Sequence, residues 1–308
     1  MFKRLFSALL ATLMLFAALP ALADTPQPIE IIPYDELTST AEGQHHYLLL
    51  CTDSWEANPK NLGNTDGIVL VTLDTRAHRV MLTSIIRDAL VQRPDGVIGR
   101  INYIAKNYSP EALCQVISQH LDVKVEDYIL FDFGQIARII DHLGGVDIEV
   151  NDSEASYLRR YPLSPEQTSP SMGNAGTYKF YGRAAVIYMR IRKAGGGGDF
   201  MRTQRVRTVL STLADQCREI SYDQAKDLLD SIMENTLLTN MNTEQLVAAM
   251  DQAYSLRDCT VEELRIPQDD AVHPISYVGM SVQELDWEKC REDFADYLGS
   301  SWLVMDED

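Results

Sequence analysis

The positive charge of this acidic chain is concentrated between residues 183 and 207. Six arginines and Lys193 stand there against one acid, Asp199, so the segment carries +6 while the whole chain has a formal net charge of −18. Guanidinium groups donate paired hydrogen bonds to phosphate oxygens, and backbone N–H groups at a helix start add further donors. The segment therefore predicts a phosphate or pyrophosphate site. The residues alone equally allow a solvated charged face with Arg202 paired to an internal carboxylate.

Two of these arginines are expected on a strand. Residues 187 to 192 alternate between apolar and polar side chains. Every second side chain of a strand points to the same face, so Arg190 and Arg192 would project together. The pattern predicts that both guanidinium groups belong to one site.

Two further arginines are expected at the start of a helix. Glycines 195 to 198 would form a flexible turn, and Asp199 would cap a helix that runs to about Cys217. Arg202 falls on the apolar stripe of that helix, and Arg205 flanks the stripe. Because a buried arginine is costly unless it is paired, we expect an anionic group to meet Arg202.

Acidic residues beside two predicted strands could supply metal chemistry. Asp53 ends the first apolar strand and Asp66 lies just before the second, so the two carboxylates could converge at one edge of the sheet. Such a pair could hold Mg²⁺, which prefers oxygen ligands and shares them with substrate phosphates. Taken singly, each is more often a turn or capping aspartate.

Charged residues directly after a third apolar segment are further candidates. Arg87 and Asp88 follow "SII" and form either an edge salt bridge or part of a site. Arg100 and Asn102, in "GRINY", give a weaker signal. The chain contains no HExxH, CxxC, GxSxG or GxGxxG motif and no P-loop.

These residues need a scaffold, and apolar runs bounded by turn residues predict an α/β fold. Strands are expected at 45–53, 68–74, 79–85, 128–133, 146–150 and 260–267, of which the second and third form an antiparallel hairpin. Helices are expected at 109–121, 134–143, 199–217, 223–235, 243–255 and 284–299. Residues 151 to 176 are predicted to form a long surface loop. The prediction is a single three-layer domain from 45 to 305, with a mixed central sheet flanked by helices.

The first residues have the layout of a secretory signal. Lys3 and Arg4 precede an apolar run from residue 5 to 19, which is followed by Ala-Leu-Ala. Residues 1–23 are therefore expected to be a signal peptide, or an N-terminal anchor if they are not cleaved, and 24–44 a linker. The rest of the chain would lie outside the cytoplasmic membrane.

Removal of the signal leaves 25 basic residues against 45 acidic ones, a formal charge of −20. Nucleic acid phosphates select basic surfaces, so this balance argues against nucleic acid as a partner.

The five cysteines are odd in number, so at least one is expected to be a free thiol. Cys51 and Cys114 lie on a predicted strand and a predicted helix, where they are expected to fill the core. A disulfide among Cys217, Cys259 and Cys290 remains open.

Seven spaced segments, in this order, resemble the LytR-CpsA-Psr family of cell-envelope proteins. The similarity runs from about Tyr47 to Val209, with a weaker one at "GMSVQELDWEKCRE". The segments are "LLLCTDS", "TDGIVLVTLD", "SIIRDALV", "RINY", "YILFDFGQIARIIDHLGGVDIEV", "AGTYKFYGRAAVIYMRIRK" and "GDFMRTQRV". Members of the family are extracytoplasmic, bind polyprenyl pyrophosphate lipids and transfer a lipid-linked glycopolymer onto peptidoglycan with Mg²⁺. The resemblance implies the same partners here, at a membrane surface.

The resemblance also implies roles by position. The pyrophosphate would be held by Arg87, Arg190, Arg192, Arg202 and Arg205, with Arg100 standing where the family usually has a lysine. Asp53 and Asp66 would hold the metal, and Asp199 would orient the arginines. The mechanism also calls for a base that deprotonates the attacking hydroxyl, for which Asp88 is the first candidate and Asp66 the alternative. The lipid tail would lie between the sheet and helices that include Leu113, Val116, Ile136, Ile139 and Ile140, unless these residues are ordinary core.

The chain departs from the family pattern at several of these segments. Trp55 and Asn64 replace usual arginines, Gly67 replaces a threonine, and Cys51 replaces a glycine. Ile86 stands in place of a proline and Val206 in place of a glutamine. The expected function is a glycopolymer phosphotransferase, and the alternatives are a non-catalytic polyprenyl-phosphate-binding scaffold and a hydrolase of the pyrophosphate lipid.

Overall fold

The computed structural model describes residues 25–192, 194 and 198–299. Its centre is a six-stranded sheet in the order β10-β3-β2-β1-β6-β9. The strands are β1 (Gln44–Thr52), β2 (Thr65–Asp74), β3 (Arg79–Ile85), β6 (Asp127–Phe131), β9 (Leu238–Thr239) and β10 (Val261–Ile266). The β1–β6 and β3–β10 pairs are parallel and the other pairs are antiparallel, so the sheet is mixed.

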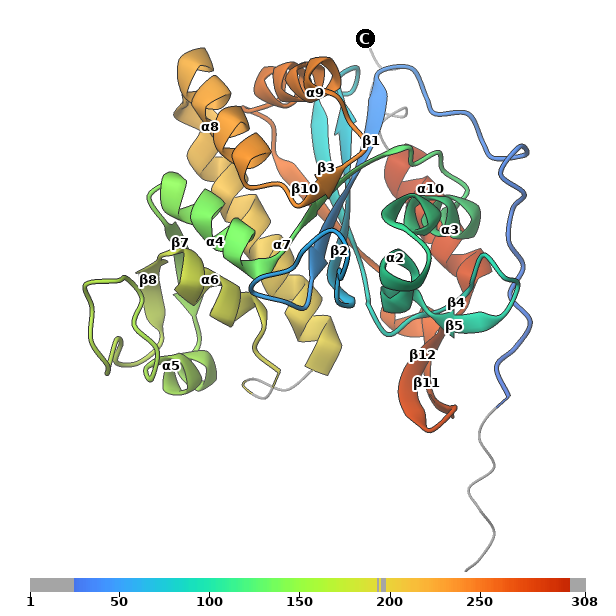
Figure 1. Ribbon diagram of the computed structural model, residues 1–308, viewed down its shortest axis with the longest axis horizontal. Helices are drawn as coiled ribbons and strands as arrows, with labels where there is room; N and C mark the ends of the chain where they lie inside the picture. Colours follow the sequence, from blue (N-terminus) through green and yellow to red (C-terminus); the bar gives the residue numbers. More distant parts are fainter. Residues whose placement is uncertain (1–24, 193, 195–197, 300–308) are drawn as a thin grey trace, which may run out of the picture.

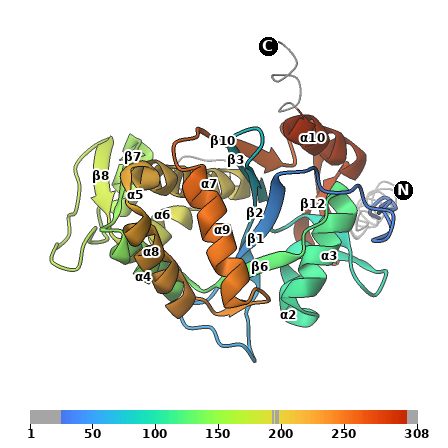
Figure 2. The ribbon, with the colours of Figure 1, turned by 90° about the horizontal axis from the view of Figure 1, so that it is seen from above.

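Helices cover both faces of this sheet (Figures 1 and 2). On one side lie α2 (Ile104–Asn107), α3 (Pro110–Leu121) and α10 (Trp287–Gly299), and on the other lie α7 (Gly198–Gln216), α8 (Tyr222–Glu234) and α9 (Thr243–Ser255). Successive side chains of β1 point to opposite faces of the sheet. Leu48 and Leu50 join the core under α3 and α10, and Tyr47 and Leu49 face the helices on the other side. The predicted mixed sheet between helical layers is confirmed.

A smaller group of elements packs beside the sheet around its own apolar cluster (Figure 1). It contains α4 (Phe133–His142), β7 (Val146–Val150), α5 (Asp152–Leu158), β8 (Gly176–Phe180) and α6 (Gly182–Met189). Two further strand pairs are β4 (Leu90–Gln92) with β5 (Ile98–Arg100), and β11 (Val272–Tyr277) with β12 (Met280–Leu285). Single 3-10 turns span Ile101–Tyr103, Cys217–Glu219 and Asp269–Ala271.

Local signals explain several elements that the sequence predicted. The β2–β3 hairpin turns at residues 75 to 78, with Asp74 opposite Arg79. Helix α3 begins with Pro110 after Ser109, whose side chain accepts a hydrogen bond from the Ala112 N–H. These predictions are confirmed.

The predicted strand at 187–192 is wrong. Residues up to Met189 belong to helix α6, and Arg190 ends that helix. The buried residues Ala184, Ala185 and Tyr188 follow helical spacing, and a short alternating run is compatible with that spacing too. Arg190 and Arg192 therefore lie at a helix end and in the chain that follows it.

Two other boundaries also differ from prediction. The stretch 151–176 contains helix α5, which begins with a reciprocal capping box between Asn151 and Glu154. Near the C-terminus, residues 280–285 form β12, so the last helix begins at Trp287 and not at 284.

Residues 25 to 43 run along the domain without a regular element before β1. Leu37 is buried, and Thr38 hydrogen-bonds through its N–H and its hydroxyl to the Asp122 carboxylate. The expected signal at 1–23, glycines 195 to 197 and residues 300 to 305 lie outside the described residues. No helix in the described part of the chain is both long enough and apolar enough to cross a membrane.

All five cysteines are free thiols. Cys114 is buried in the core as expected, whereas Cys51 is only partly buried. The disulfide that was left open among Cys217, Cys259 and Cys290 is not formed.

Candidate functional site

Four charged side chains from three segments form a compact cluster at one end of the sheet. Asp66 pairs through Oδ1 with Arg87 Nη1, and its Oδ2 lies 3.4 Å from Arg202 Nη1. Asp199 Oδ1 lies 3.3 Å from both Arg87 Nε and Arg202 Nη2. The side chain of Arg202 is only 4% exposed, so the inward-facing arginine and its anionic partners are both observed. This is the internal pairing that the sequence allowed, and it gathers predicted site residues in one place.

A β-bulge positions Asp66. Cys51 pairs with Gly67 and Thr52 pairs with Thr65, so Asp66 has no residue opposite it on β1. An extra residue of this kind turns a side chain out of the ladder, and such bulges often stand beside active sites. The bulge directs the Asp66 carboxylate toward the arginines.

Burial makes the negative partners of this cluster important. Desolvation lowers the pKa of Arg202, and the carboxylates of Asp199 and Asp66 oppose that effect. Replacement of these carboxylates by a phosphate would keep the guanidinium groups charged and paired. Asp199 thus contacts both Arg87 and Arg202 in this structure.

Asp88 and Arg100 extend the cluster. Asp88 Oδ1 lies 3.2 Å from Arg100 Nη1, and Oδ2 lies 3.6 Å from Arg87 Nε. Burial, followed by the nearby charge of Asp199, raises the pKa of Asp88 despite these arginines. A carboxylate with a raised pKa is a stronger base. Asp88 Oδ1 accepts no hydrogen bond from the described residues, whereas each oxygen of Asp66 accepts one from an arginine. Between the two candidates for the base, the geometry favours Asp88.

Two of the other predicted arginines, Arg190 and Arg192, are exposed. The Arg190 guanidinium lies over the Phe133 ring, 4.2 Å from its centroid. Neither Arg190 nor Arg192 forms an ion pair with any described residue. Their guanidinium groups can therefore meet a ligand directly, whereas that of Arg202 is buried and already paired with Asp66 and Asp199.

An arginine to which the sequence reading gave no role stands nearby. Arg183 lies 4.7 Å from the centroid of the Trp55 ring, and Trp55 packs edge-on against Phe133. Trp55 replaces a usual family arginine, yet the aromatic pair carries Arg183 and Arg190 on its two rings. The signal was present in the sequence, because Arg183 belongs to the same basic segment.

Arg205 has a different environment from the one that the resemblance implied. Its Nε lies 2.8 Å from Glu154 Oε1, and its two Nη groups donate to the carbonyl oxygens of Ile191 and Ala194 at 2.9 Å. The residue is 1% exposed. With each nitrogen engaged, Arg205 holds the segment that carries Arg192. Glu154 was missed by the sequence reading, and the Asn151-to-Glu154 capping-box spacing was the signal that could have found it.

Asp53 lies at the same end of the β1–β2 pair. Its Oδ1 accepts a hydrogen bond from the Asn64 N–H at 2.9 Å, and its Oδ2 accepts one from Asn64 Nδ2 at 3.2 Å. The residue is exposed, so its carboxylate retains lone pairs toward solvent. Asp53 and Asp66 offer the hard oxygen donors that Mg²⁺ prefers, and Asp66 would exchange an arginine contact for the ion.

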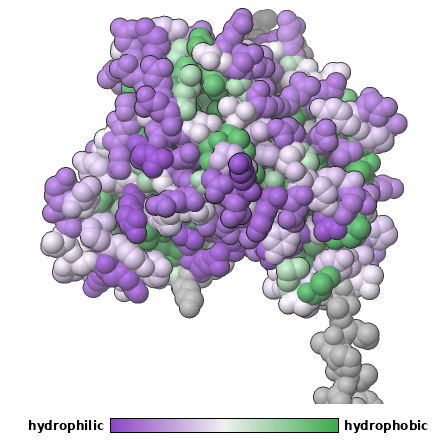
Figure 3. All heavy atoms as spheres, viewed as in Figure 1, coloured by the Kyte–Doolittle hydropathy of each residue, from purple (hydrophilic) through white to green (hydrophobic). Residues whose placement is uncertain are grey.

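An apolar cavity of about 360 Å³ lies between the sheet and helices α7, α8 and α9. Figure 3 shows apolar atoms and a hollow between α8 and α9. None of the five residues suggested for a lipid cavity lines it. Leu113 and Val116 are instead core residues on the opposite face, where α10 covers them. The cavity therefore does not lie at the suggested residues. Leu113, Val116 and Ile140 are buried core residues, Ile136 packs against the smaller cluster, and Ile139 is partly buried.

The cavity and the charged cluster share helix α7. Leu210 lines the cavity, and Arg202 precedes it by eight residues, or about 12 Å of helix. On β1, Tyr47 and Leu49 line the cavity, and Cys51 follows on the same face. The arrangement can accept a ligand with an anionic head and a long apolar tail.

Comparison with known proteins identifies relatives of this chain. The model of the LytR_cpsA_psr family matches residues 25–292. Biofilm regulatory protein A of Streptococcus mutans is 25% identical over 195 residues, which cover 60% of this chain and 46% of that protein. The polyisoprenyl-teichoic acid–peptidoglycan teichoic acid transferase TagV of Bacillus subtilis is 26% identical over 207 residues, 63% of this chain and 49% of that protein. The chain thus spans about half the length of these two relatives.

Solved structures share the fold. Bacillus subtilis TagV superposes with a TM-score of 0.65 at 20% identity, covering 84% of this chain and 98% of that chain. TagT bound to LIIa-WTA gives a TM-score of 0.66 at 21% identity, covering 84% and 91%. The family match extends over most of the residues that the structure describes. The chain is a member of the LytR-CpsA-Psr family.

Proposed function

We propose that this protein is an extracytoplasmic phosphotransferase that moves a glycopolymer from a polyprenyl-pyrophosphate carrier onto peptidoglycan. The observation that carries the proposal is the buried Asp66–Arg87–Asp199–Arg202 cluster, next to an apolar cavity along α7. Relatives such as TagV are named as teichoic acid transferases, which supports the same reaction class here. The N-terminal signal pattern supports a location at the outer face of the membrane.

The pyrophosphate would bind by exchange. Its oxygens would take over donors of Arg87 and Arg202 that now face Asp66 and Asp199, while the exposed Arg190 and Arg192 would close on it from the end of α6. Arg205 would act as a positioning residue for that segment. The polyprenyl tail would occupy the apolar cavity, whose lining comes from the sheet and from α7 to α9.

The transfer step requires charge stabilisation and alignment more than a covalent nucleophile. A hydroxyl oxygen of the acceptor would attack the phosphorus that carries the glycopolymer, forming a new P–O bond. The bond from that phosphorus to the bridging oxygen would break, and polyprenyl phosphate would leave with the electron pair. Asp88 would accept the hydroxyl proton. Asp53 and Asp66 would hold Mg²⁺, which stabilises negative charge on phosphoryl oxygens when it is bound.

The chief alternative is a polyprenyl-phosphate-binding scaffold without turnover. The departures at Trp55, Asn64 and Gly67 favour it, because they remove two arginines and a threonine from the family pattern. Arg183 lies over the Trp55 ring and would supply a guanidinium group near the missing arginine, and Cys51 stands opposite Gly67 and would fill the space of the missing threonine side chain. Asn64 still binds the Asp53 carboxylate as a neutral donor.

The test follows polyprenyl phosphate release from a lipid-pyrophosphate-linked sugar, with and without peptidoglycan fragments. Release that requires the fragments supports transfer. Release in their absence supports the hydrolase alternative and contradicts the proposal. Lipid that stays bound and intact in both conditions identifies a scaffold.

A further inference from the structure

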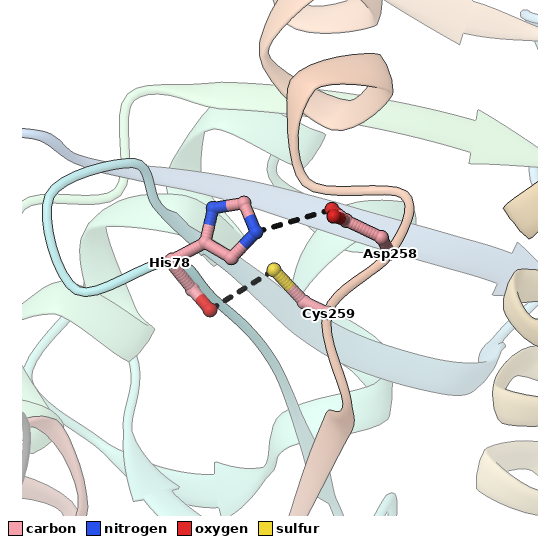
Figure 4. Close-up of side chains that lie close together, drawn as sticks. All are labelled: His78, Asp258 and Cys259. Carbon is pink, nitrogen blue, oxygen red and sulfur yellow. Dashed lines mark hydrogen bonds and ion pairs between the residues drawn. The ribbon is translucent and has the colours of Figure 1, made fainter.

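Three side chains with metal-ligand chemistry meet far from the arginine cluster in the fold. His78 Nε2 lies 3.1 Å from Asp258 Oδ1, and Cys259 Sγ lies 2.9 Å from the His78 carbonyl oxygen (Figure 4). The imidazole nitrogen, carboxylate oxygen and thiol sulfur lie within 4.8 Å of one another. Among the described residues, no other group of three or more His, Cys, Asp or Glu side chains meets so closely.

The backbone already brings the three residues together. His78 belongs to the turn between β2 and β3 and adopts a left-handed conformation with φ of 54°. Asp258 and Cys259 belong to the connection between α9 and β10. Figure 4 shows the imidazole of His78 directed across the gap toward Asp258, with the Cys259 sulfur beside it. Two segments about 180 residues apart in the chain therefore converge on one point.

The donor set matches a borderline-soft divalent cation. Zinc binds thiolate sulfur, imidazole nitrogen and carboxylate oxygen at about 2.0–2.3 Å, which separates its ligand atoms by about 3–4 Å. The His78–Asp258 distance is already in that range. On binding, the Cys259 thiol would lose its proton and turn from the His78 carbonyl toward the ion.

The surroundings leave room for the ion and a water. The side chains of His78 and Asp258 are 56% and 71% exposed, so solvent can complete a tetrahedral shell. Two positive charges lie nearby: Arg257 precedes Asp258 in the chain, and Arg218 donates to the Asp258 carbonyl oxygen at 3.4 Å. Arg218 is itself paired with Asp215 at 2.9 Å, which offsets part of its repulsion.

We propose that His78, Asp258 and Cys259 form a site for Zn²⁺ or a similar divalent cation. Cys259 packs with Leu73 and Leu256, and all three line the apolar cavity. A bound ion would tie the end of α9 to the β2–β3 turn at the rim of that cavity. The site would stabilise the helical layer over the sheet. This inference does not depend on the proposed transfer reaction.

The test uses Co²⁺ as a spectroscopic stand-in for Zn²⁺, with the full chain kept reduced. A thiolate bound to Co²⁺ gives a charge-transfer band in the near ultraviolet. We expect the band in the wild type, its loss in Cys259→Ser, and its retention in Cys217→Ser, which changes another free thiol. Zn²⁺ added afterwards should displace the band. Absence of the band in the wild type, or its persistence in Cys259→Ser, would overturn the proposal.

Thermal unfolding provides a second readout that does not rely on the thiol. Zn²⁺ should raise the melting temperature of the wild type, and this rise should be lost in His78→Ala. An equal Zn²⁺-dependent shift in both proteins would contradict the site, because the ion would then bind elsewhere. A His45→Ala control, which changes another exposed histidine, should retain the shift.

Discussion

Cys51 and Gly67 face each other directly across β1 and β2, and a Cβ atom on residue 67 would lie 3.1 Å from the Cβ of Cys51. The family usually has glycine at the first position and threonine at the second. The two departures are therefore a steric exchange, in which a side chain on one strand replaces a side chain on the other.

The exchange predicts coupled mutational effects. Gly67→Thr alone should reduce the free energy of unfolding by about 1–3 kcal/mol, because the added side chain overpacks the pair. Adding Cys51→Gly should recover most of that loss, since the space is then vacant. Urea unfolding of both single variants and the double variant gives the coupling energy. Additive effects of the two substitutions would show that the positions do not compensate each other.

Arg202 should contribute to lipid binding through its charge. Arg202→Ala is expected to weaken binding of a short-chain polyprenyl pyrophosphate about 10- to 100-fold, the equivalent of one charge-assisted hydrogen bond. Arg207→Ala is the matched control, because Arg207 is a buried arginine on the same helix that pairs with Glu263 at 3.0 Å. Calorimetry on both folded variants checks the prediction. Equal weakening in both, or wild-type affinity of Arg202→Ala, would contradict the head-group assignment.

Arg205 should act mainly through stability. Arg205→Ala leaves Glu154 buried without its partner and should cost about 3–5 kcal/mol of unfolding free energy. Arg218→Ala removes an exposed pair with Asp215 and should cost less than about 1 kcal/mol. Denaturant unfolding compares the two variants. Similar small losses would mean that Arg205 does not fix the segment after α6.

Asp53 should affect metal dependence more than lipid binding. Asp53→Asn removes a charged oxygen donor, so the Mg²⁺ concentration for half-maximal turnover should rise while the affinity for the pyrophosphate lipid changes little. Asp74→Asn is the control, since Asp74 lies at the other end of β2 and pairs with Gln44. Turnover is measured across a Mg²⁺ titration. An unchanged Mg²⁺ midpoint in Asp53→Asn would count against the metal assignment.

Asp88 should govern the acid limb of activity. Its pKa is raised above the ordinary value of 3.8, so turnover should increase as the pH rises through that raised pKa and the carboxylate forms. Asp88→Asn should lose this pH dependence, and its turnover should be about 10²- to 10⁴-fold lower than that of the wild type. A pH profile of the variant that keeps the wild-type acid limb would assign the base to another residue.

The same shift has a consequence for stability. Because folding raises the pKa of Asp88, the contribution of this group to stability is present below its unfolded pKa and is lost as the pH rises through its folded pKa. Asp88→Asn should therefore increase the free energy of unfolding relative to the wild type at neutral pH, and the difference should shrink in acid. Unfolding measured at both pH values tests the sign.

The sequence predicted those parts of the molecule that depend on local pattern. The β2–β3 hairpin, α3 and the inward-facing Arg202 follow from alternation, capping and helical spacing, and each is observed. Residues 187 to 192 were misread because six alternating residues fit the end of a helix as well as a strand. Whether such a short run forms a helix or a strand is decided by the residues that pack against it.

Features that depend on packing between distant segments were not predictable. The position of the cavity depends on how completely the helices cover each face of the sheet. Residues of α3 and α10 fill one face, and the cavity lies on the other face, under α7 to α9. The direction of the Asp66 side chain depends on a β-bulge that arises where β2 pairs with β1. The engagement of Arg205 depends on Glu154, 51 residues away in the chain.

The central claim is that the arginine cluster holds a lipid pyrophosphate for transfer of its glycopolymer. The most direct measurement incubates the protein with a labelled polyprenyl-pyrophosphate-linked sugar, peptidoglycan fragments and Mg²⁺, beside an Arg190→Ala control. Arg190 is exposed and without an ion pair among the described residues, so this substitution should leave the fold intact. We predict label on the fragments with the wild type and little with Arg190→Ala. Label that stays on the lipid with the wild type, or that transfers equally with both proteins, would contradict the account.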